Sequence, residues 1–274
     1  MSIGIFDSGI GGLTVFKEIK KLLPRKKIIY LGDTARVPYG TRSAEIVRRY
    51  SLENAYFLKN RGINFLVVAC NTSSAVALEV LRSKFDMPIV GVIEPGAKAA
   101  VRATKNGRVA VIGTPATINS GAYPKAISNM DKSIKVVGQP CSLFVPIVEE
   151  GWLEHDATRL IAKEYFSLIR AQDKLVDTVV LGCTHYPLLK PILKTVAEEI
   201  FDHDITLVDS AIETALALKG LTDNAELSIT DDNGSVNFYI TDFPERFKQV
   251  GGLFLGEEIE NVELVALPSL EEAK

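Results

Sequence analysis

Two of the three cysteines, Cys70 and Cys183, stand in similar surroundings. Each follows a short apolar run and precedes polar residues, as in Ala69-Cys70-Asn71-Thr72 and Gly182-Cys183-Thr184-His185. A thiolate is a competent proton acceptor and a thiol a competent proton donor. Two cysteines in matched positions therefore suit proton transfer on two sides of one carbon atom. The alternative for each cysteine alone is a buried thiol that packs as a small apolar side chain.

The residues after each cysteine favour the start of a helix. Thr72, Ser73 and Ser74 are good caps for a helix over residues 75–81, and Thr184 is a possible cap with Pro187 tolerated in the first turn. A helix N-terminus stabilises a thiolate and lowers the thiol pKa from its ordinary value of about 8.5. We therefore expect both thiols to ionise readily.

Asp7 and His185 are candidate acid/base helpers of the two thiols. Asp7 ends the first apolar run, and His185 is the one histidine of three that follows a predicted strand end. A carboxylate or an imidazole beside a thiol can accept or shuttle its proton. Asp7 has a second interpretation, as a residue that caps the next helix or closes the turn.

Other polar segments carry weaker signals. Gly9-x-Gly11-Gly12 lacks the G-x-G-x-x-G spacing of a dinucleotide site, so its glycines indicate a close turn. Cys141 follows no predicted strand end and is expected to be a buried spectator. Glu149-Glu150-Gly151 is either a solvated helix end or a source of one site carboxylate. Cys183 and His185 form the only close Cys/His pair, which is too few ligands to predict a metal site.

These residues need strands to position them, and the sequence predicts an α/β fold. Short β-rich runs alternate with segments of helical period such as residues 44–60. In such folds ligands lie beyond the carboxyl ends of the strands. The predicted strands are Ile3–Phe6, Ile28–Leu31, Phe65–Ala69, Ile89–Val92, Val109–Ile112, Ile134–Val137, Thr178–Leu181 and Thr206–Val208.

The order of elements suggests two similar α/β domains with mainly parallel sheets. In the first half one predicted strand runs into Asp7 and a later one into Cys70. In the second half one runs into Thr114 and a later one into Cys183, and the separation in sequence is comparable in the two pairs. We expect the domains to comprise residues 1–95 plus 209–274, and residues 96–208. Residues 226–230 and 235–241 are predicted to form a hairpin through Asn233-Gly234 and to return to the first domain.

Composition excludes several classes of function. The net charge of −3 gives no electrostatic footprint for nucleic acid or an anionic membrane. No apolar run approaches the roughly 20 residues of a membrane span, and the first residues lack the pattern of a secretory leader. We therefore expect a cytoplasmic chain with reduced thiols, without nucleic-acid or membrane partners.

Four motifs together resemble the glutamate racemases of the cofactor-independent aspartate/glutamate racemase family. They lie in order along most of the chain and are residues 4–12 (Gly-Ile-Phe-Asp-Ser-Gly-Ile-Gly-Gly), 32–40 (Gly-Asp-Thr through Pro-Tyr-Gly), 69–72 (Ala-Cys-Asn-Thr) and 181–187 (Leu-Gly-Cys-Thr-His-Tyr-Pro). The resemblance implies interconversion of L- and D-glutamate for peptidoglycan, without pyridoxal phosphate or another cofactor. It also implies a site between two α/β domains, and a homodimer.

The resemblance also implies roles for individual residues. Cys70 and Cys183 match the paired acid/base cysteines, Asp7 and His185 match their auxiliary groups, and Asp33 and Glu149 match further acidic positions. Glu149 is chosen over Glu150. The positions that match glutamate-binding residues are Asp7, Ser8, Tyr39, Gly40, Asn71, Thr72, Thr184 and His185.

Three other functions remain open on the residues alone. A sister two-thiol enzyme acting on aspartate or another dicarboxylate would differ in pocket depth. A non-catalytic binding protein of two lobes would use the same cleft without needing thiols. A thiol hydrolase fits less well, because it needs one nucleophile and has no use for a matched second cysteine.

Overall fold

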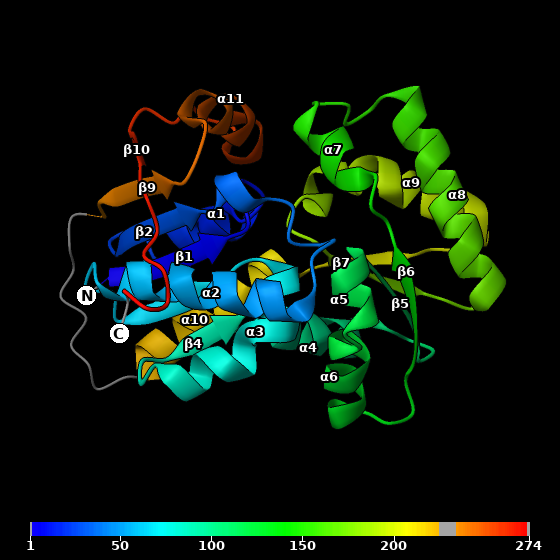
Figure 1. Ribbon diagram of the computed structural model, residues 1–274. Coiled ribbons are helices and arrows are strands. Elements are labelled where there is room, and N and C mark those ends of the chain that lie inside the picture. The colour runs from blue at the N-terminus through cyan, green and yellow to red at the C-terminus, as the bar shows by residue number, and fades with distance from the viewer. Residues whose placement is uncertain (1, 225–233, 273–274) are drawn as a thin grey trace.

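The computed structural model describes residues 2–224 and 234–272. The chain forms two parallel sheets, each with helices on both faces (Figure 1). The first sheet has the order β10-β9-β2-β1-β3-β4 and the second the order β6-β5-β7-β8. Strands of the first sheet are β1 (Ser2–Asp7), β2 (Lys27–Gly32), β3 (Phe65–Val68), β4 (Ile89–Gly91), β9 (Val236–Ile240) and β10 (Val262–Leu264). Strands of the second are β5 (Arg108–Gly113), β6 (Lys135–Pro140), β7 (Thr178–Gly182) and β8 (Thr206–Asp209).

All eight strands predicted between residues 3 and 208 are confirmed, with ends displaced by three residues at most. In the tail, β9 covers the predicted strand over 235–241, whereas residues 226–230 lie outside the described residues. The neighbours of β9 are β2 and β10, both parallel to it, so this strand lies within the first sheet.

Helices cover both faces of the first sheet, and each face has its own hydrophobic core. Alternate side chains of β1 face opposite sides because successive residues of a strand point to opposite faces. Ile3 and Ile5 pack with α1 (Leu13–Leu22), α10 (Ser210–Asn224) and α11 (Pro244–Leu255). Phe6 packs on the other side with α2 (Ala44–Lys59) and α3 (Asn71–Lys84). The predicted helix over 44–60 is therefore confirmed as a packing element.

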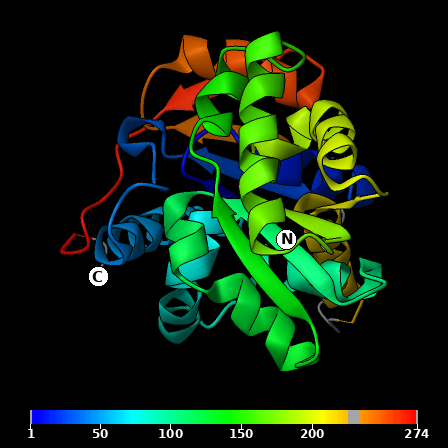
Figure 2. The ribbon, with the colours of Figure 1, turned by 90° about the vertical axis from the view of Figure 1, so that its right-hand side faces the viewer.

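The second sheet is covered in the same way. Val109 and Val111 pack toward α4 (Ile93–Ala103) and α6 (Ala122–Met130), and Ala110 and Ile112 toward the opposite helices. Those opposite helices are α7 (Phe144–Glu149), α8 (Asp156–Gln172) and α9 (Lys190–Phe201), and the short α5 (Pro115–Asn119) follows β5. Figure 2 shows α8 as the long helix nearest the viewer, over this second half.

The two sheets share one strand order, which confirms the predicted likeness of the halves. Within the first sheet, β2-β1-β3-β4 has the order and parallel direction of β6-β5-β7-β8 in the second. The strands β9 and β10 are an addition to the first sheet alone. The predicted domain boundaries fall within α4 and at the end of β8, and we retain this division of the chain as a proposal. Among the described residues, no helix is long and apolar enough to cross a membrane.

Candidate active site

Both cysteines follow the carboxyl end of a strand whose neighbour carries another polar loop. β1 and β3 are adjacent, with Phe6 opposite Val68, so Asp7 and Cys70 emerge side by side. β5 and β7 are adjacent, with Gly113 opposite Gly182, which brings Thr114 beside Cys183. The carboxyl edge of a parallel sheet is where ligands bind in open α/β folds.

Cys70 is itself the N-cap residue of α3. Its sulfur accepts a hydrogen bond from the backbone N–H of Ser73 at 3.5 Å, and its thiol donates to Ser8 Oγ at 3.6 Å. The predicted helix start at residue 75 was therefore four residues too late, because the cysteine takes the capping position that we assigned to the hydroxyl residues after it.

The environment of Cys70 favours the neutral thiol. Burial, together with the nearby charge of Asp7, raises the pKa of Cys70 to about 11, while the hydrogen bonds with Ser73 and Ser8 only partly oppose this. The sequence-based expectation of a lowered pKa is wrong for this cysteine. A helix N-terminus stabilises an anion, but at 5% exposure the loss of hydration is the larger effect.

Asp7, which lies near Cys70, is completely buried, and one of its carboxylate oxygens makes no hydrogen bond. Its Oδ2 accepts the backbone N–H of Gly9 at 2.9 Å, while Oδ1 has no partner. Burial raises the pKa of Asp7, although the charge of His185 and backbone N–H groups oppose it. Asn71 Nδ2 and Ser73 Oγ are likewise buried without a partner. Three of the four such side-chain atoms in the described residues thus surround Cys70.

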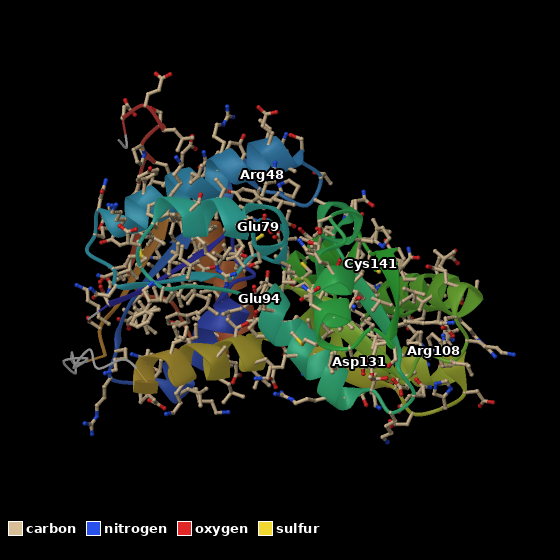
Figure 3. All side chains as sticks on the ribbon, turned by 90° about the horizontal axis from the view of Figure 1, so that it is seen from below. Arg48, Glu79, Glu94, Arg108, Asp131 and Cys141 are labelled. Carbon is tan, nitrogen blue, oxygen red and sulfur yellow. The ribbon has the colours of Figure 1, made fainter. Side chains whose placement is uncertain are left out.

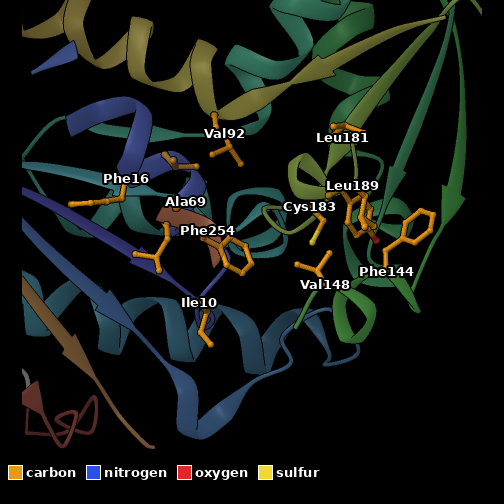
Figure 4. Close-up of a cluster of buried hydrophobic side chains, with 14 of the residues drawn as sticks. Ile10, Phe16, Ala69, Val92, Phe144, Val148, Leu181, Cys183, Leu189 and Phe254 are labelled. Atoms are coloured by element: carbon orange, nitrogen blue, oxygen red, sulfur yellow. The ribbon is translucent and has the colours of Figure 1, made fainter. Parts of the chain in front are cut away.

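Cys183 has a different neighbourhood. It is followed by a 3₁₀ turn, η2 (Tyr186–Leu189), and α9 begins only at Lys190. Thr184 caps no helix, so the expectation of a helix start directly after this cysteine is wrong. Pro187 does lie in the first turn of η2, and α9 follows η2 directly with a second proline, Pro191, in its own first turn. Figure 4 shows Cys183 between Val148 and Leu189, with Phe254 on the side of the first half.

Cys183 does not directly precede an α-helix, and instead begins a row of three ionisable groups. Cys183 Sγ lies 3.9 Å from His185 Nδ1, and His185 Nε2 lies 3.1 Å from Glu149 Oε1. Burial lowers the pKa of His185, but the interactions with Cys183 and Glu149 outweigh it and raise the pKa to about 10. The structure thus places Glu149, the last residue of α7, against the histidine, while Glu150 points to solvent with 62% of its side chain exposed.

The two cysteine loops are in contact through the glycine loop after β1. A Cβ atom on Gly11 would lie 2.3 Å from Thr184 Oγ1 and 2.5 Å from His185 Nδ1, so only glycine fits there. Thr14 Oγ1 also donates to the carbonyl oxygen of Thr184 at 3.1 Å. The glycines of this loop therefore serve close packing of one half against the other.

A second contact between the halves is a cluster of three hydroxyl groups. Thr72 Oγ1 lies 2.9 Å from Thr114 Oγ1 and 3.3 Å from Thr117 Oγ1. Beside them, the backbone N–H of Ala116 donates to the carbonyl oxygen of Gly40 at 2.9 Å, and a Cβ on Gly40 would clash with Thr114. The sequence analysis missed Thr114 and Thr117 as site residues. Their signal was the place of Thr114 as the counterpart of Asp7 in the second half.

Tyr39 and Asp33 belong to a network on the first half. The ring of Tyr39 packs in one cluster with Cys70 and Val47, but its hydroxyl donates to Asp33 Oδ2 and accepts from Asn54 Nδ2 at 3.1 Å. Asp33 Oδ2 also accepts from Arg36 Nε at 2.7 Å. Only the ring and backbone of Tyr39 are therefore available to the cysteine side.

Tyr123 interacts with groups near both thiols. Its hydroxyl donates to Asn71 Oδ1 at 2.8 Å. Burial raises the pKa of Tyr123, and the charge of Cys183 contributes to that increase. Tyr123 comes from α6 in the second half, so this is a further contact with the first turn of α3 that sequence reasoning missed.

Cys141 lies within the second half (Figure 3), directly after the end of β6 and two residues before Leu143, the N-cap of α7, so the expectation that it follows no strand end is wrong. It is fully buried, its thiol donates to the carbonyl oxygen of Gln139 at 3.5 Å, and burial raises its pKa far above the ordinary value. Its carbonyl oxygen accepts the hydroxyl of Tyr186 at 2.8 Å. In residues 2–224 and 234–272, no group of three or more His, Cys, Asp and Glu side chains is arranged to hold a metal ion.

The chain combines two parallel sheets with two strand-end cysteines, one kept neutral by burial and one beside a histidine and a carboxylate. The family described as Asp/Glu/Hydantoin racemase matches residues 3–218, and the chain belongs to this family.

Individual relatives are closely similar. The glutamate racemase of Geobacter metallireducens is 51% identical over 273 residues, which cover 99% of this chain and 98% of that protein. The glutamate racemase of Persephonella marina is 49% identical and covers 98% of this chain and 100% of that protein. Among solved structures, glutamate racemase from Francisella tularensis in complex with D-glutamate has a TM-score of 0.88 at 38% identity and covers 97% of each chain.

Proposed function

We propose that this protein interconverts L-glutamate and D-glutamate, without a cofactor, by moving the α-proton between Cys70 and Cys183. D-glutamate made in this way supplies peptidoglycan synthesis. The observation that carries the proposal is the pair of strand-end thiols with opposite environments, in a chain about half identical to glutamate racemases along nearly its whole length.

The proton transfer follows from the protonation states that the two environments favour. In the starting state that we propose, Cys183 is the thiolate beside the imidazolium of His185, and Cys70 is the thiol. The thiolate takes the α-proton of one enantiomer, and the electron pair of the C–H bond moves into the α-carboxylate. Cys70 then gives its proton to the opposite face of the α-carbon. The reverse reaction starts from the thiolate left at Cys70 and the thiol formed at Cys183.

Asp7 and Glu149 support this exchange from behind the thiols. Asp7 has one unpartnered oxygen close to Cys70 and can hold the proton that Cys70 gains or loses. Glu149 stabilises the imidazolium of His185 at 3.1 Å. These groups do not touch the α-carbon in this arrangement; they set the proton balance of the two cysteines.

Neutral donors hold the two carboxylates of the substrate. Asn71 Nδ2 and the backbone N–H groups at the start of α3 suit one carboxylate, with Ser8 beside Cys70 and the loop of Tyr39 and Gly40 next to it. The hydroxyls of Thr72 and Thr184 supply further donors. Arg36, the one Lys or Arg in the motifs, is paired with Asp33 and Glu53, so charge developing on the α-carboxylate is stabilised by fixed dipoles in a water-poor site.

Incubation of L- and D-glutamate in deuterated water tests the proposal. With no added cofactor, α-deuterium should appear in step with loss of chirality from either enantiomer. If no amino acid of a panel exchanges its α-proton, the protein is a binding protein. If aspartate is racemised faster than glutamate, it is a sister two-thiol enzyme, and both outcomes contradict the proposal.

Two further expectations concern assembly and location. We propose that the protein acts as a homodimer in the cytoplasm, with glutamate as its partner and no contact with nucleic acid or membrane. Sedimentation at micromolar concentrations should give twice the mass of 29.9 kDa, and a mass equal to one chain would contradict the dimer.

A further inference from the structure

The last helix of the chain, α11, contacts the ion pair that serves Cys183. This helix follows β9 of the first sheet and lies beyond residues 3–218, which the racemase family matches. In Figure 1, α11 and α7 face each other from the two halves of the molecule. Arg246 Nη2, on α11, lies 3.5 Å from Glu149 Oε2 and 3.6 Å from Glu150 Oε1.

The two oxygens of Glu149 therefore have different partners. Oε1 meets His185 Nε2 at 3.1 Å and Oε2 meets Arg246. A carboxylate held at both oxygens has one orientation, and partners behind an acid/base group in this way fix its direction as well as its charge. About two turns further along the same helix, Phe254 packs edge-to-face against the ring of His185, with centroids 5.3 Å apart. The helix thus touches both members of the pair.

We propose that Arg246 is a positioning residue for racemisation, which keeps Glu149 ionised and directed at His185 so that the imidazolium stays beside Cys183. This role rests on the proposed function, because it acts on the acid/base chain of that reaction. Arg246 does not reach the thiol itself, and 43% of its side chain is exposed, so it acts through Glu149.

The charges around the pair give the sign of a pH effect. Glu149 is faced by His185, by Arg246 and by its neighbour Glu150, and His185 is faced by Cys183, Glu149 and Asp7. Burial alone would raise the pKa of Glu149, but His185 and Arg246 hold it below the ordinary value. Without Arg246 the carboxylate takes up its proton at a higher pH, and the His185–Glu149 ion pair is lost there.

Replacement of Arg246 by Gln and by Lys tests the role. For each variant, kcat and KM are measured for both enantiomers from about pH 4 to about pH 8. For Arg246→Gln we expect kcat to fall about tenfold with KM nearly unchanged, and the acidic decline of kcat to move to higher pH. Arg246→Lys should restore most of kcat and the wild-type profile, because an ammonium supplies the same charge.

Two control variants separate this role from general effects of losing an ion pair. Arg82, in an ion pair with Glu94 at 2.9 Å, has the same 43% exposure of its side chain, so Arg82→Gln removes a comparable surface pair and should leave kcat unchanged. Glu150→Gln should do the same, because Arg246 acts through Glu149.

Several outcomes would overturn the role of Arg246. These are an unchanged pH profile in Arg246→Gln, an equal fall of kcat at every pH together with a lowered melting temperature, or a loss of activity that Lys does not restore. Failure of the proposed function is recognised separately, because the wild-type protein would then fail to racemise glutamate.

Discussion

The loops of Cys70 and Cys183 occupy equivalent strand ends of two similar halves, yet their chemistry differs. Cys70 caps α3 and has only neutral hydrogen-bond partners, and burial beside Asp7 raises its pKa to about 11. Cys183 precedes a 3₁₀ turn and contacts His185, whose pKa is raised to about 10. Fold symmetry thus places the two sulfur atoms, but their surroundings differ: Cys70 is kept a thiol, whereas Cys183 lies beside His185 and Glu149. A two-base reaction needs this inequality, because one sulfur must donate while the other accepts.

The largest effects should come from removing either sulfur. Cys70→Ser and Cys183→Ser should each reduce racemisation of glutamate by about 10³- to 10⁴-fold, since a hydroxyl is a poor proton acceptor. Because each variant retains the base on one face, residual α-proton exchange in deuterated water should survive for opposite enantiomers in the two variants. Exchange with the same enantiomer in both would contradict the assignment of one thiol to each face.

Removal of the His185 imidazole should reduce the difference between the two thiols, because it changes the surroundings of Cys183. His185→Asn should lower kcat about 10²-fold, because the thiolate loses its cationic partner. In the wild-type protein, kcat should decline as pH rises through about 10, where the imidazolium loses its proton. An alkaline decline that is the same in both proteins would show that another group controls it.

The same histidine should make stability depend on pH. Its folded pKa of about 10 lies above the ordinary 6.5, so its contribution to the free energy of unfolding is complete below pH 6.5 and is lost as pH rises through 10. The difference in unfolding free energy between wild type and His185→Asn should shrink over that window in urea titrations. A difference that grows with pH would reverse the sign assigned to the ion pair.

A methyl group on Gly11 should disturb the contact between the two loops. Gly11→Ala should lower kcat/KM by about 10- to 10²-fold and destabilise the fold by about 1–3 kcal/mol, because Cβ would overlap Thr184 and His185. Gly220→Ala, in the exposed part of α10 with nothing within 4 Å of the added atom, is the matched control. It should raise stability slightly, with unchanged kinetics.

A smaller effect is expected at the hydroxyl cluster between the halves. Thr72→Val should raise KM about three- to tenfold, because Thr72 lies 2.9 Å from Thr114 and its loss leaves that hydroxyl with fewer partners. Steady-state kinetics with both enantiomers measure this. An effect on kcat alone would contradict a role of the cluster in substrate binding and would indicate a role in the chemical step.

The smallest effect should come from the third cysteine. Cys141→Ala should leave kcat and KM for glutamate unchanged and cost about 1 kcal/mol of stability, since Cys141 is buried and serves as packing. Thermal unfolding and the racemisation assay together test this. A loss of activity comparable to that of Cys183→Ser would make Cys141 a third functional thiol and end the comparison of two.

Sequence patterns were sufficient for the framework and less so for the local chemistry. The central strands were found because buried parallel strands are continuous apolar runs, as in β1, β3 and β7, and the edge strand β6 was placed three residues short at its end because its last residues, Gly-Gln-Pro, are not apolar. The helix after Cys70 was placed four residues late because a cysteine rarely serves as an N-cap, and the turn after Cys183 was read as a helix because Pro187 suits both.

The protonation of the site could not be predicted from residue types. The thiol pKa was expected to fall at a helix start, but the outcome at Cys70 depends on how much hydration burial removes. Likewise, Thr117 and Tyr123 reach the site from distant elements, and Arg246 does so from the far end of the chain. Such contacts depend on how the halves pack, which neither spacing nor periodicity records.

The late position of β9 has a consequence for the order in which the protein folds during synthesis. The second sheet is contiguous and has all four strands once Asp209 has been made. The first sheet begins earlier but keeps the edge of β2 unpaired until Val236–Ile240 follow. An unpaired edge strand is a template for association with other chains. The edge of β2 in a nascent chain therefore stays open from the synthesis of Gly32 to that of Val236, and both thiols are present once Cys183 has been made. The strand that closes this edge is followed directly by α11, which packs against His185.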